Sequence, residues 1–487
     1  MLFASAIALL IGFRANGSYS RAFLLAAMIP VLPALFDRAY RGRLISALKI
    51  RWERLKAYEP ARDAIPVTTT LLFVVLPSAV LYIANGKTIG AGDTRPVMPS
   101  AVSVVTDGDY RLDEFCREGS RRKMFDADAP SGFFLRREGA HVYSSYPVGM
   151  TVFATPVAAM ARVAGANFDK PMTMIRLEKI AAVAVAAIGI GLFFLVAIQV
   201  APVVPSLVTT GMLATGSVMF TTVGQGLWQH GGLVIWSLLA MLVEFRSRPR
   251  WSLRSALLEG FACGMMPACR LSSATFLIPF GIWMLWRSPK RAVFVVGTAL
   301  VTAMPFALLY FSIYGSLAGP STPQLRGVAW NWSVLWPLFG VLFSPARGLF
   351  VYQPWIVLVV ISFFWVGAKK IDRGPEGWKT FCLAAIGFQL LLNACWMNWW
   401  GGWCWGSRLL AEVVPLCALL ALPVVAALWE SRRGRGIVLS LGILAILMHA
   451  PCAFFRANDW NHVVDIDQNT QWLWSWSHAP FLQPFQS

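Results

Sequence analysis

Apolar runs long enough to cross a membrane recur along almost the whole chain, separated by short polar segments. A spanning helix needs about 20 apolar residues, and fewer where the helix is short or the bilayer is locally thin. The runs predicted to span are 1–13, 21–36, 67–84, 172–200, 203–222, 228–245, 255–269, 271–286, 292–313, 348–367, 378–397, 409–429 and 436–455. This pattern predicts an all-α polytopic membrane protein with about 11–13 transmembrane helices.

Charge supports this class and predicts an orientation. Only 14% of the 487 residues are charged, against about a quarter in soluble domains. The basic clusters lie at 38–62, 246–254, 287–291, 369–373 and 432–435. Each follows an even-numbered run, so all fall on one side, which the positive-inside rule makes cytoplasmic. We therefore expect a multi-pass membrane protein with a cytoplasmic amino terminus and an outer carboxyl terminus. The net charge of +18 is explained without a nucleic-acid partner.

Three parts follow from this organisation. Residues 1–66 form an apolar hairpin, beginning with an uncleaved helix, and a basic segment that is either an amphipathic helix on the inner leaflet or a solvated loop. Residues 67–455 form a transmembrane module with a large outer loop at 85–171. Residues 456–487 form an outer tail that either caps an acceptor site or lies on the membrane.

The outer loop begins with a short polar motif, Gly92-Asp93-Thr94-Arg95-Pro96. A carboxylate held at the membrane surface can take a proton from a hydroxyl group. The alternative is that Asp93 pairs with Arg95 or caps a helix. We expect that helix to run over residues 99–115.

Other outer segments combine glycines with aromatic and amide side chains, which suits recognition of a sugar by stacking and hydrogen bonding. The alternative is an ordinary interfacial aromatic belt. The candidate sugar or acceptor contacts are Arg95, Tyr146, Gln225, Gln229, His230, Trp399, Trp400 and Trp403.

Three arginines, Arg270, Arg347 and Arg408, are expected at the outer ends of apolar runs. An arginine in apolar surroundings needs an anion, and a phosphate fits the guanidinium fork. The alternative is that each arginine extends to lipid headgroups. Three such residues on one face favour a lipid-linked phosphate as the partner. The eight cysteines form no CxxC pair, and no motif calls for a metal or another cofactor.

Four motifs resemble the GT-C superfamily of integral-membrane glycosyltransferases, which includes protein mannosyltransferases and aminoarabinose transferases. They are GDTRP at 92–96 with LDEF at 112–115, YPVG at 146–149, FSPARGLF at 343–350 and WWGGWCWGSR at 399–408. The resemblance covers the chain from about residue 67 onward.

The resemblance, which is to bacterial members of the group, implies a GT-C-like fold in a bacterial inner membrane. It also implies an inverting transfer from a polyprenyl-phosphate sugar to a glycan, lipid or protein acceptor on the periplasmic side. It implies that Asp93 is the general base and that Arg270 and Arg347 contact the donor phosphate. The chain departs from the pattern in two ways: extra apolar runs precede the acidic loop, and no DxD pair stands beside Asp93. The second departure puts any divalent metal in doubt.

The competing hypothesis is a lipid or sugar transporter or flippase. Such a protein is expected to have charged or broken helices near mid-membrane, often in two related halves. Few ionisable residues lie inside the runs. Glu178, Glu259, Glu412 and His449 are among them and lie mostly near the ends, and no repeat is visible. A polymer ligase, a further alternative, predicts a large outer loop late in the chain, whereas here it is early.

Overall fold

The computed structural model describes residues 38–60, 63–86, 88–125, 133–247, 251–321, 330, 332–365, 371–454 and 460–485. The predicted spans 1–13 and 21–36 lie outside the described residues. The chain divides into two compact units. The first comprises Met1–Ser145, Thr151–Gly191 and Gly224–Leu227, and the second comprises Tyr146–Met150, Leu192–Val223 and Trp228–Ser487.

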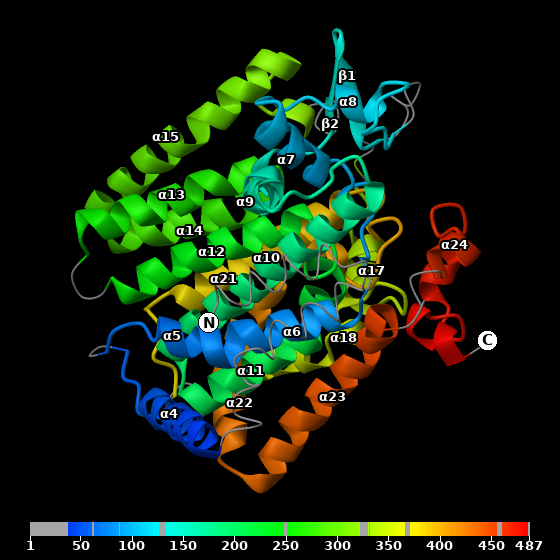
Figure 1. The fold of residues 1–487 in the computed structure, drawn as a ribbon. Coiled ribbons are helices and arrows are strands. Elements are labelled where there is room, and N and C mark those ends of the chain that lie inside the picture. Colours follow the sequence, from blue (N-terminus) through cyan, green and yellow to red (C-terminus); the bar gives the residue numbers. More distant parts are fainter. Residues whose placement is uncertain are drawn as a thin grey trace. The chain divides into compact units, whose positions relative to one another are not determined.

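The first unit combines helices with one small hairpin (Figure 1). Its elements are α4 (Arg38–Lys56), α5 (Val67–Thr70), the π-helix η1 (Leu71–Val75), α6 (Leu76–Ala84), α7 (Val97–Thr106), α8 (Asp113–Cys116), β1 (Leu135–Glu138), β2 (His141–Ser144), most of α9 (Gly149–Val163) and the first part of α10 (Pro171–Val200). The two strands pair antiparallel, with Leu135 opposite Ser144.

The helix expected over residues 99–115 is wrong in extent, because the structure divides that stretch into α7 and α8. Gly108, just beyond α7, has a left-handed φ of 75°, a conformation that stops a helix and costs glycine little. Leu112 and Phe115 are fully buried, so these residues pack inside the protein.

The regular elements in the described residues of the second unit are helices, and one isolated antiparallel bridge joins Trp330 to Trp396. Its elements are the end of α10, α11 (Val203–Thr215), the π-helix η2 (Met219–Val223), α12 (Gln229–Arg246), α13 (Leu253–Cys269), η3 (Leu271–Ser273), α14 (Ala274–Arg287), α15 (Pro289–Tyr314), η4 (Gly319–Ser321), α17 (Leu335–Phe343), α18 (Leu349–Tyr352), η5 (Pro354–Ile356), α19 (Val357–Phe364), α21 (Trp378–Cys395), η6 (Arg408–Leu410), α22 (Val414–Trp429), α23 (Arg432–Phe454), α24 (Trp460–Val464), η8 (Thr470–Trp474) and η9 (Pro480–Phe485).

The prediction of a helical, polytopic membrane protein is confirmed. Within the described residues, five helical stretches are long and apolar enough to cross a membrane. They are Val67–Ala84, Pro171–Val200, Pro289–Tyr314, Trp378–Cys395 and Arg432–Phe454. The other predicted runs in the described part of the chain are helical too, but they form helices that are shorter, broken or less apolar.

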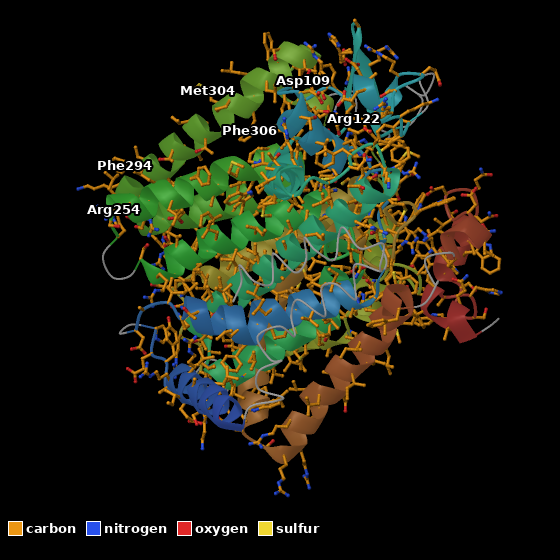
Figure 2. The ribbon with its side chains drawn as sticks, in the orientation of Figure 1. Asp109, Arg122, Arg254, Phe294, Met304 and Phe306 are labelled. Atoms are coloured by element: carbon orange, nitrogen blue, oxygen red, sulfur yellow. The ribbon has the colours of Figure 1, made fainter. Side chains whose placement is uncertain are left out.

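The close packing of α13 on α15 shows how the sequence builds this fold. A Cβ added to Gly260 would lie 2.5 Å from the carbonyl oxygen of Val295, and one added to Gly264 would lie 2.4 Å from that of Ala299. Small residues four apart let two apolar helices approach closely. The other side of α15 carries exposed apolar side chains, Phe294 and Met304 among them (Figure 2), as expected of a lipid-facing helix.

Candidate functional site

The first unit holds Asp93 in the turn that leads into α7. The N-cap position of α7 is Pro96, so Asp93 is not its capping residue. Asp93 is half-buried, and Arg95 is exposed with its guanidinium 5.8 Å from the ring centre of Phe134. A Cβ on Gly92 would lie 2.3 Å from the Phe133 ring. Glycine therefore lets the turn lie directly against the two aromatic rings, and a larger residue would displace the exposed Phe133 ring.

Helix α10 anchors this turn through buried polar groups. The Glu178 carboxylate accepts from the Thr94 hydroxyl, and its Oε1 accepts from the Leu227 amide at 3.3 Å. Lys179, which is fully buried, donates to the Gly224 carbonyl at 3.1 Å and to Gln225 Oε1. These bonds tie the turn, α10 and the segment Gly224–Leu227 together.

Gln225 belongs to this anchor. Its side chain is fully buried, and its Oε1 accepts from Asn85 Nδ2 at 2.6 Å as well as from Lys179. These contacts give Gln225 a part in holding the chain, and the sugar contact expected from the sequence stays a prediction.

The second unit contains a buried cluster of charged and polar groups around Glu412. Glu412 lies just before α22 and is 6% exposed. Its Oε2 is 2.6 Å from Nδ1 of His230, and its Oε1 is 3.7 Å from Nη1 of Arg270. Gln389 donates to Oε1 at 3.1 Å, and the Ser272 hydroxyl donates to it at 3.4 Å. Glu412 therefore connects His230 and Arg270, which come from different helices.

Arg270 occupies the break between α13 and α14. It is the C-cap residue of α13 and has an extended backbone, and its Nη1 lies 2.7 Å from Nδ1 of His230. The expectation that the run over 255–286 is interrupted at this arginine is confirmed.

Arg408 and Trp228 extend the cluster. The Arg408 guanidinium lies 4.4 Å from the ring centre of Trp228, the N-cap residue of α12. The Trp228 indole nitrogen is buried and has no hydrogen-bond partner among the described residues. A buried donor without a partner is costly, so this N–H offers a place for an acceptor atom of a ligand.

Arg347 donates hydrogen bonds to several protein atoms in the described part of the chain. It is 2% exposed. Its Nε donates to the Trp400 carbonyl and its Nη2 to the Gly402 carbonyl, both at 3.0 Å. Further bonds reach the Ala346 carbonyl at 2.9 Å and Asn461 Oδ1 at 3.0 Å. Arg347 thus holds several loops together.

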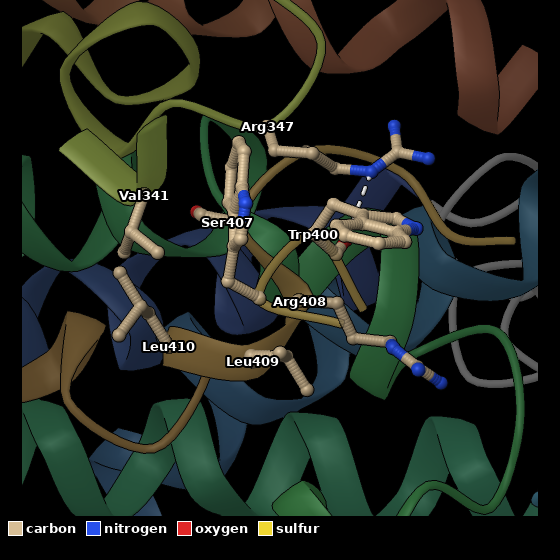
Figure 3. Close-up of a pocket in the computed structure, with 9 residues that line it drawn as sticks. Val341, Arg347, Trp400, Ser407, Arg408, Leu409 and Leu410 are labelled. Atoms are coloured by element: carbon tan, nitrogen blue, oxygen red, sulfur yellow. Dashed lines mark hydrogen bonds between the residues drawn. The ribbon is translucent and has the colours of Figure 1, made fainter. Parts of the chain in front are cut away.

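Arg347 and Arg408 line one small pocket with a cavity volume of about 10 Å³. Figure 3 shows both arginine side chains extending in the same direction, with Trp400 drawn between them. The remaining lining residues are Val341, Trp399, Gly406, Ser407, Leu409 and Leu410. The structure therefore brings together arginines that are 61 positions apart in the sequence.

Comparisons with known proteins add the following. No family model and no curated protein matches the sequence. A solved structure does match. It is ArnT from Cupriavidus metallidurans bound to undecaprenyl phosphate, with 12% sequence identity and a TM-score of 0.47. The match covers 85% of this chain and 76% of that chain.

The other candidate residues are spread over several environments. Trp399 is buried and packs against Gly340, where a Cβ would lie 2.3 Å from its ring. Trp400 Nε1 donates to Asp467 at 2.7 Å, whereas Trp403 is 40% exposed. The last two candidates are Gln229, buried in the first turn of α12, and Tyr146, half-buried just before α9. Within the described residues, no group of three or more His, Cys, Asp or Glu side chains is placed to hold a metal ion.

The outer loop also contains a perturbed acid. Burial raises the pKa of the Glu114 carboxyl above its ordinary value, although the hydrogen bond from Ser103 opposes the shift. The negative charges of Asp107 and Asp109 repel the Glu114 carboxylate and so also raise its pKa. Glu114 is therefore a source of pH-dependent stability in this loop.

Sequence reasoning missed the role of Glu412, although the residue was noticed as an acid near the end of an apolar run. His230 and Glu412 are 182 positions apart, and no local pattern links them. The position of Glu412 in an apolar run was a usable signal, because a carboxylate in such a run requires a partner.

Proposed function

We propose that this protein is an inverting glycosyltransferase that moves a sugar from a polyprenyl-phosphate donor to an acceptor on the outer face of the membrane. One observation carries the proposal. Beside the buried Glu412–His230–Arg270 cluster, Arg408 lies over Trp228, whose buried indole N–H has no partner in the described residues. Cations, an available donor and the start of a long helix are the features that bind a phosphate.

The phosphate contacts in this proposal are Arg270 and Arg408. Arg347 instead holds the loop that contains Trp400 and Gly402, because four of its hydrogen bonds already go to protein atoms. This division refines the sequence-based expectation, in which all three arginines contacted the donor.

Asp93 is the proposed general base, a role that rests on the GT-C resemblance and on its half-buried position at the root of the outer loop. It accepts the proton of the acceptor hydroxyl as that oxygen attacks the anomeric carbon of the donor sugar. The bond from this carbon to the phosphate oxygen breaks, and its electron pair leaves with the polyprenyl phosphate. A single displacement inverts the anomeric centre. The arginines stabilise the leaving phosphate, so no general acid is required.

His230, Gln229, Tyr146 and Trp403 remain candidate contacts for the sugar or acceptor. Membrane lipids and the isoprenoid chain of the donor would contact the apolar exterior. A glycan, a lipid or a protein are the acceptor classes compatible with this chemistry.

The test uses the purified full-length protein and a panel of synthetic polyprenyl-phosphate hexoses and pentoses. We expect release of polyprenyl phosphate from at least one donor by the wild type, and loss of that release in Asp93→Asn. The matched control is Asp107→Asn, which changes another acid of the same loop, one paired with Arg122 at 2.8 Å. Near-normal turnover by Asp93→Asn would remove Asp93 as the base. Transport of a lipid-linked sugar without cleavage would establish the competing transporter or flippase.

A further inference from the structure

His449 is a buried ionisable residue that the proposed chemistry does not use. It lies on α23, within a stretch apolar enough to span the membrane, and is fully buried. An ionisable side chain in such a position is expensive and usually functional. Both of its ring nitrogens have partners, with Nδ1 3.0 Å from Thr221 Oγ1 and Nε2 3.3 Å from Gln353 Nε2.

The direction of the hydrogen bonds follows from these partners. Ser407 Oγ donates to Gln353 Oε1 at 3.1 Å, which leaves the amide nitrogen of Gln353 to face His449. An amide NH₂ only donates, so Nε2 of His449 accepts and carries no proton. The ring proton is then on Nδ1, which lies next to the Thr221 hydroxyl; a backbone group of Tyr352 also hydrogen-bonds the ring. A continuous chain of side chains therefore runs from Thr221 through His449 and Gln353 to Ser407.

A second set of contacts joins α23 to the same loop. Trp405 Nε1 donates to the Met448 carbonyl at 3.2 Å. Gly406 has a left-handed φ of 57°, and a Cβ there would lie 2.8 Å from the Tyr352 ring. The Tyr352 ring in turn packs edge-on against His449, with ring centres 5.7 Å apart. Trp405 is thus held by α23, and Gly406 lies against Tyr352, whose ring packs against His449 of α23.

We propose that His449 is a positioning residue that holds Arg408 in place to bind the phosphate of the lipid-linked donor. The inference rests on the proposed function for the identity of that ligand. Ser407, the last member of the chain of hydrogen bonds, is adjacent to Arg408 in sequence, and both line the pocket of Figure 3. Without the imidazole nitrogens, Gln353 loses a hydrogen-bond partner and holds Ser407 less firmly. The backbone next to Ser407 is then no longer fixed, so the Arg408 guanidinium loses its defined position.

The experiment compares His449→Phe, which keeps an aromatic ring against Tyr352, with His449→Gln, which restores a hydrogen-bonding group near Nε2. Cys452→Ala is the control, because Cys452 is equally buried one turn further along α23. The probe is undecaprenyl phosphate, with its Kd measured in detergent. Hydrogen exchange of the peptide covering residues 399–410 is measured on the same samples. If His449 contributed only to overall stability, replacing it would not selectively change the Kd or the hydrogen exchange of this peptide.

We expect His449→Phe to raise the Kd about tenfold or more, because a charge-assisted hydrogen bond contributes on that order. Exchange in 399–410 should increase, His449→Gln should recover most of both effects, and Cys452→Ala should match the wild type. An unchanged Kd and unchanged exchange in folded His449→Phe would overturn the inference. If that variant does not fold, Ser407→Ala cuts the chain at its far end and is expected to give the same two changes; their absence is equally contradictory.

Failure of the proposed function gives a different result. The wild type would then not bind undecaprenyl phosphate. In that case the phosphate-positioning role is refuted together with the function, and the exchange data still show whether His449 holds the loop.

Discussion

Replacing Arg347 separates an arginine that holds the protein together from one that binds a ligand. Its side chain is almost completely buried and donates to three backbone carbonyls and to Asn461. Alanine would leave these four acceptors without the guanidinium. Each charge-assisted bond is worth about 1.5–3 kcal/mol, and partial relaxation and entry of water reduce the total. We expect Arg347→Ala to cost on the order of 4 kcal/mol, near the upper end of single-mutant effects.

The assay is thermal unfolding of the detergent-solubilised protein, run beside a Kd measurement for undecaprenyl phosphate. A loss of that size lowers the apparent Tm by at least about 5 °C in a large domain. Arg347→Lys should recover little, because an ammonium group cannot reach several carbonyls in the geometry of a guanidinium.

Arg408→Ala is the matched comparison, since it truncates the second arginine of the same pocket. It should weaken phosphate binding roughly tenfold with a much smaller change in Tm. The reasoning is refuted if Arg347→Ala unfolds at the wild-type temperature and loses only phosphate affinity.

Three further predictions concern packing and pH. Tyr352→Phe removes a fully buried hydroxyl that has no hydrogen-bond partner among the described residues, so the apparent Tm should stay the same or rise; a drop of several degrees would show that the hydroxyl is bonded. Gly264→Val places a side chain against the Ala299 carbonyl and should cost about 1–3 kcal/mol by forcing α13 from α15, whereas unchanged unfolding would refute that close contact. Glu114 has a pKa raised by burial above the ordinary value of 4.5, so its ionisation destabilises the folded loop as pH rises above that value. Glu114→Gln should therefore unfold at a higher temperature than the wild type at pH 8 and lose this advantage at pH 4; an equal difference at both pH values would contradict it.

Much of the helical framework was predictable, because long apolar runs leave few alternatives to a helix in a membrane. The break at Arg270 was predictable for the same reason, since a guanidinium interrupts an apolar run. The division of residues 99–115 depends on the conformation of Gly108, and one glycine in a helical pattern gives a weak signal. The hairpin of β1 and β2 escaped prediction because each strand has only four residues.

The candidate site was predictable as a set of residue types but not as a set of contacts. Three arginines on one expected face pointed to an anion, and all three lie in the second unit. Their different roles depend on what surrounds them. Arg347 meets backbone carbonyls, which no sequence pattern reveals, whereas Arg270 meets a carboxylate and an imidazole supplied by distant segments of the chain.

The most direct test of the central claim is whether the purified protein cleaves a polyprenyl-phosphate sugar. The measurement is mass spectrometry of the lipid products after incubation of the wild type and Asp93→Asn with the donor panel. The account predicts that the wild type releases polyprenyl phosphate from one of these donors and that Asp93→Asn does not. Intact donors after incubation with a folded wild-type protein and each acceptor class would contradict it.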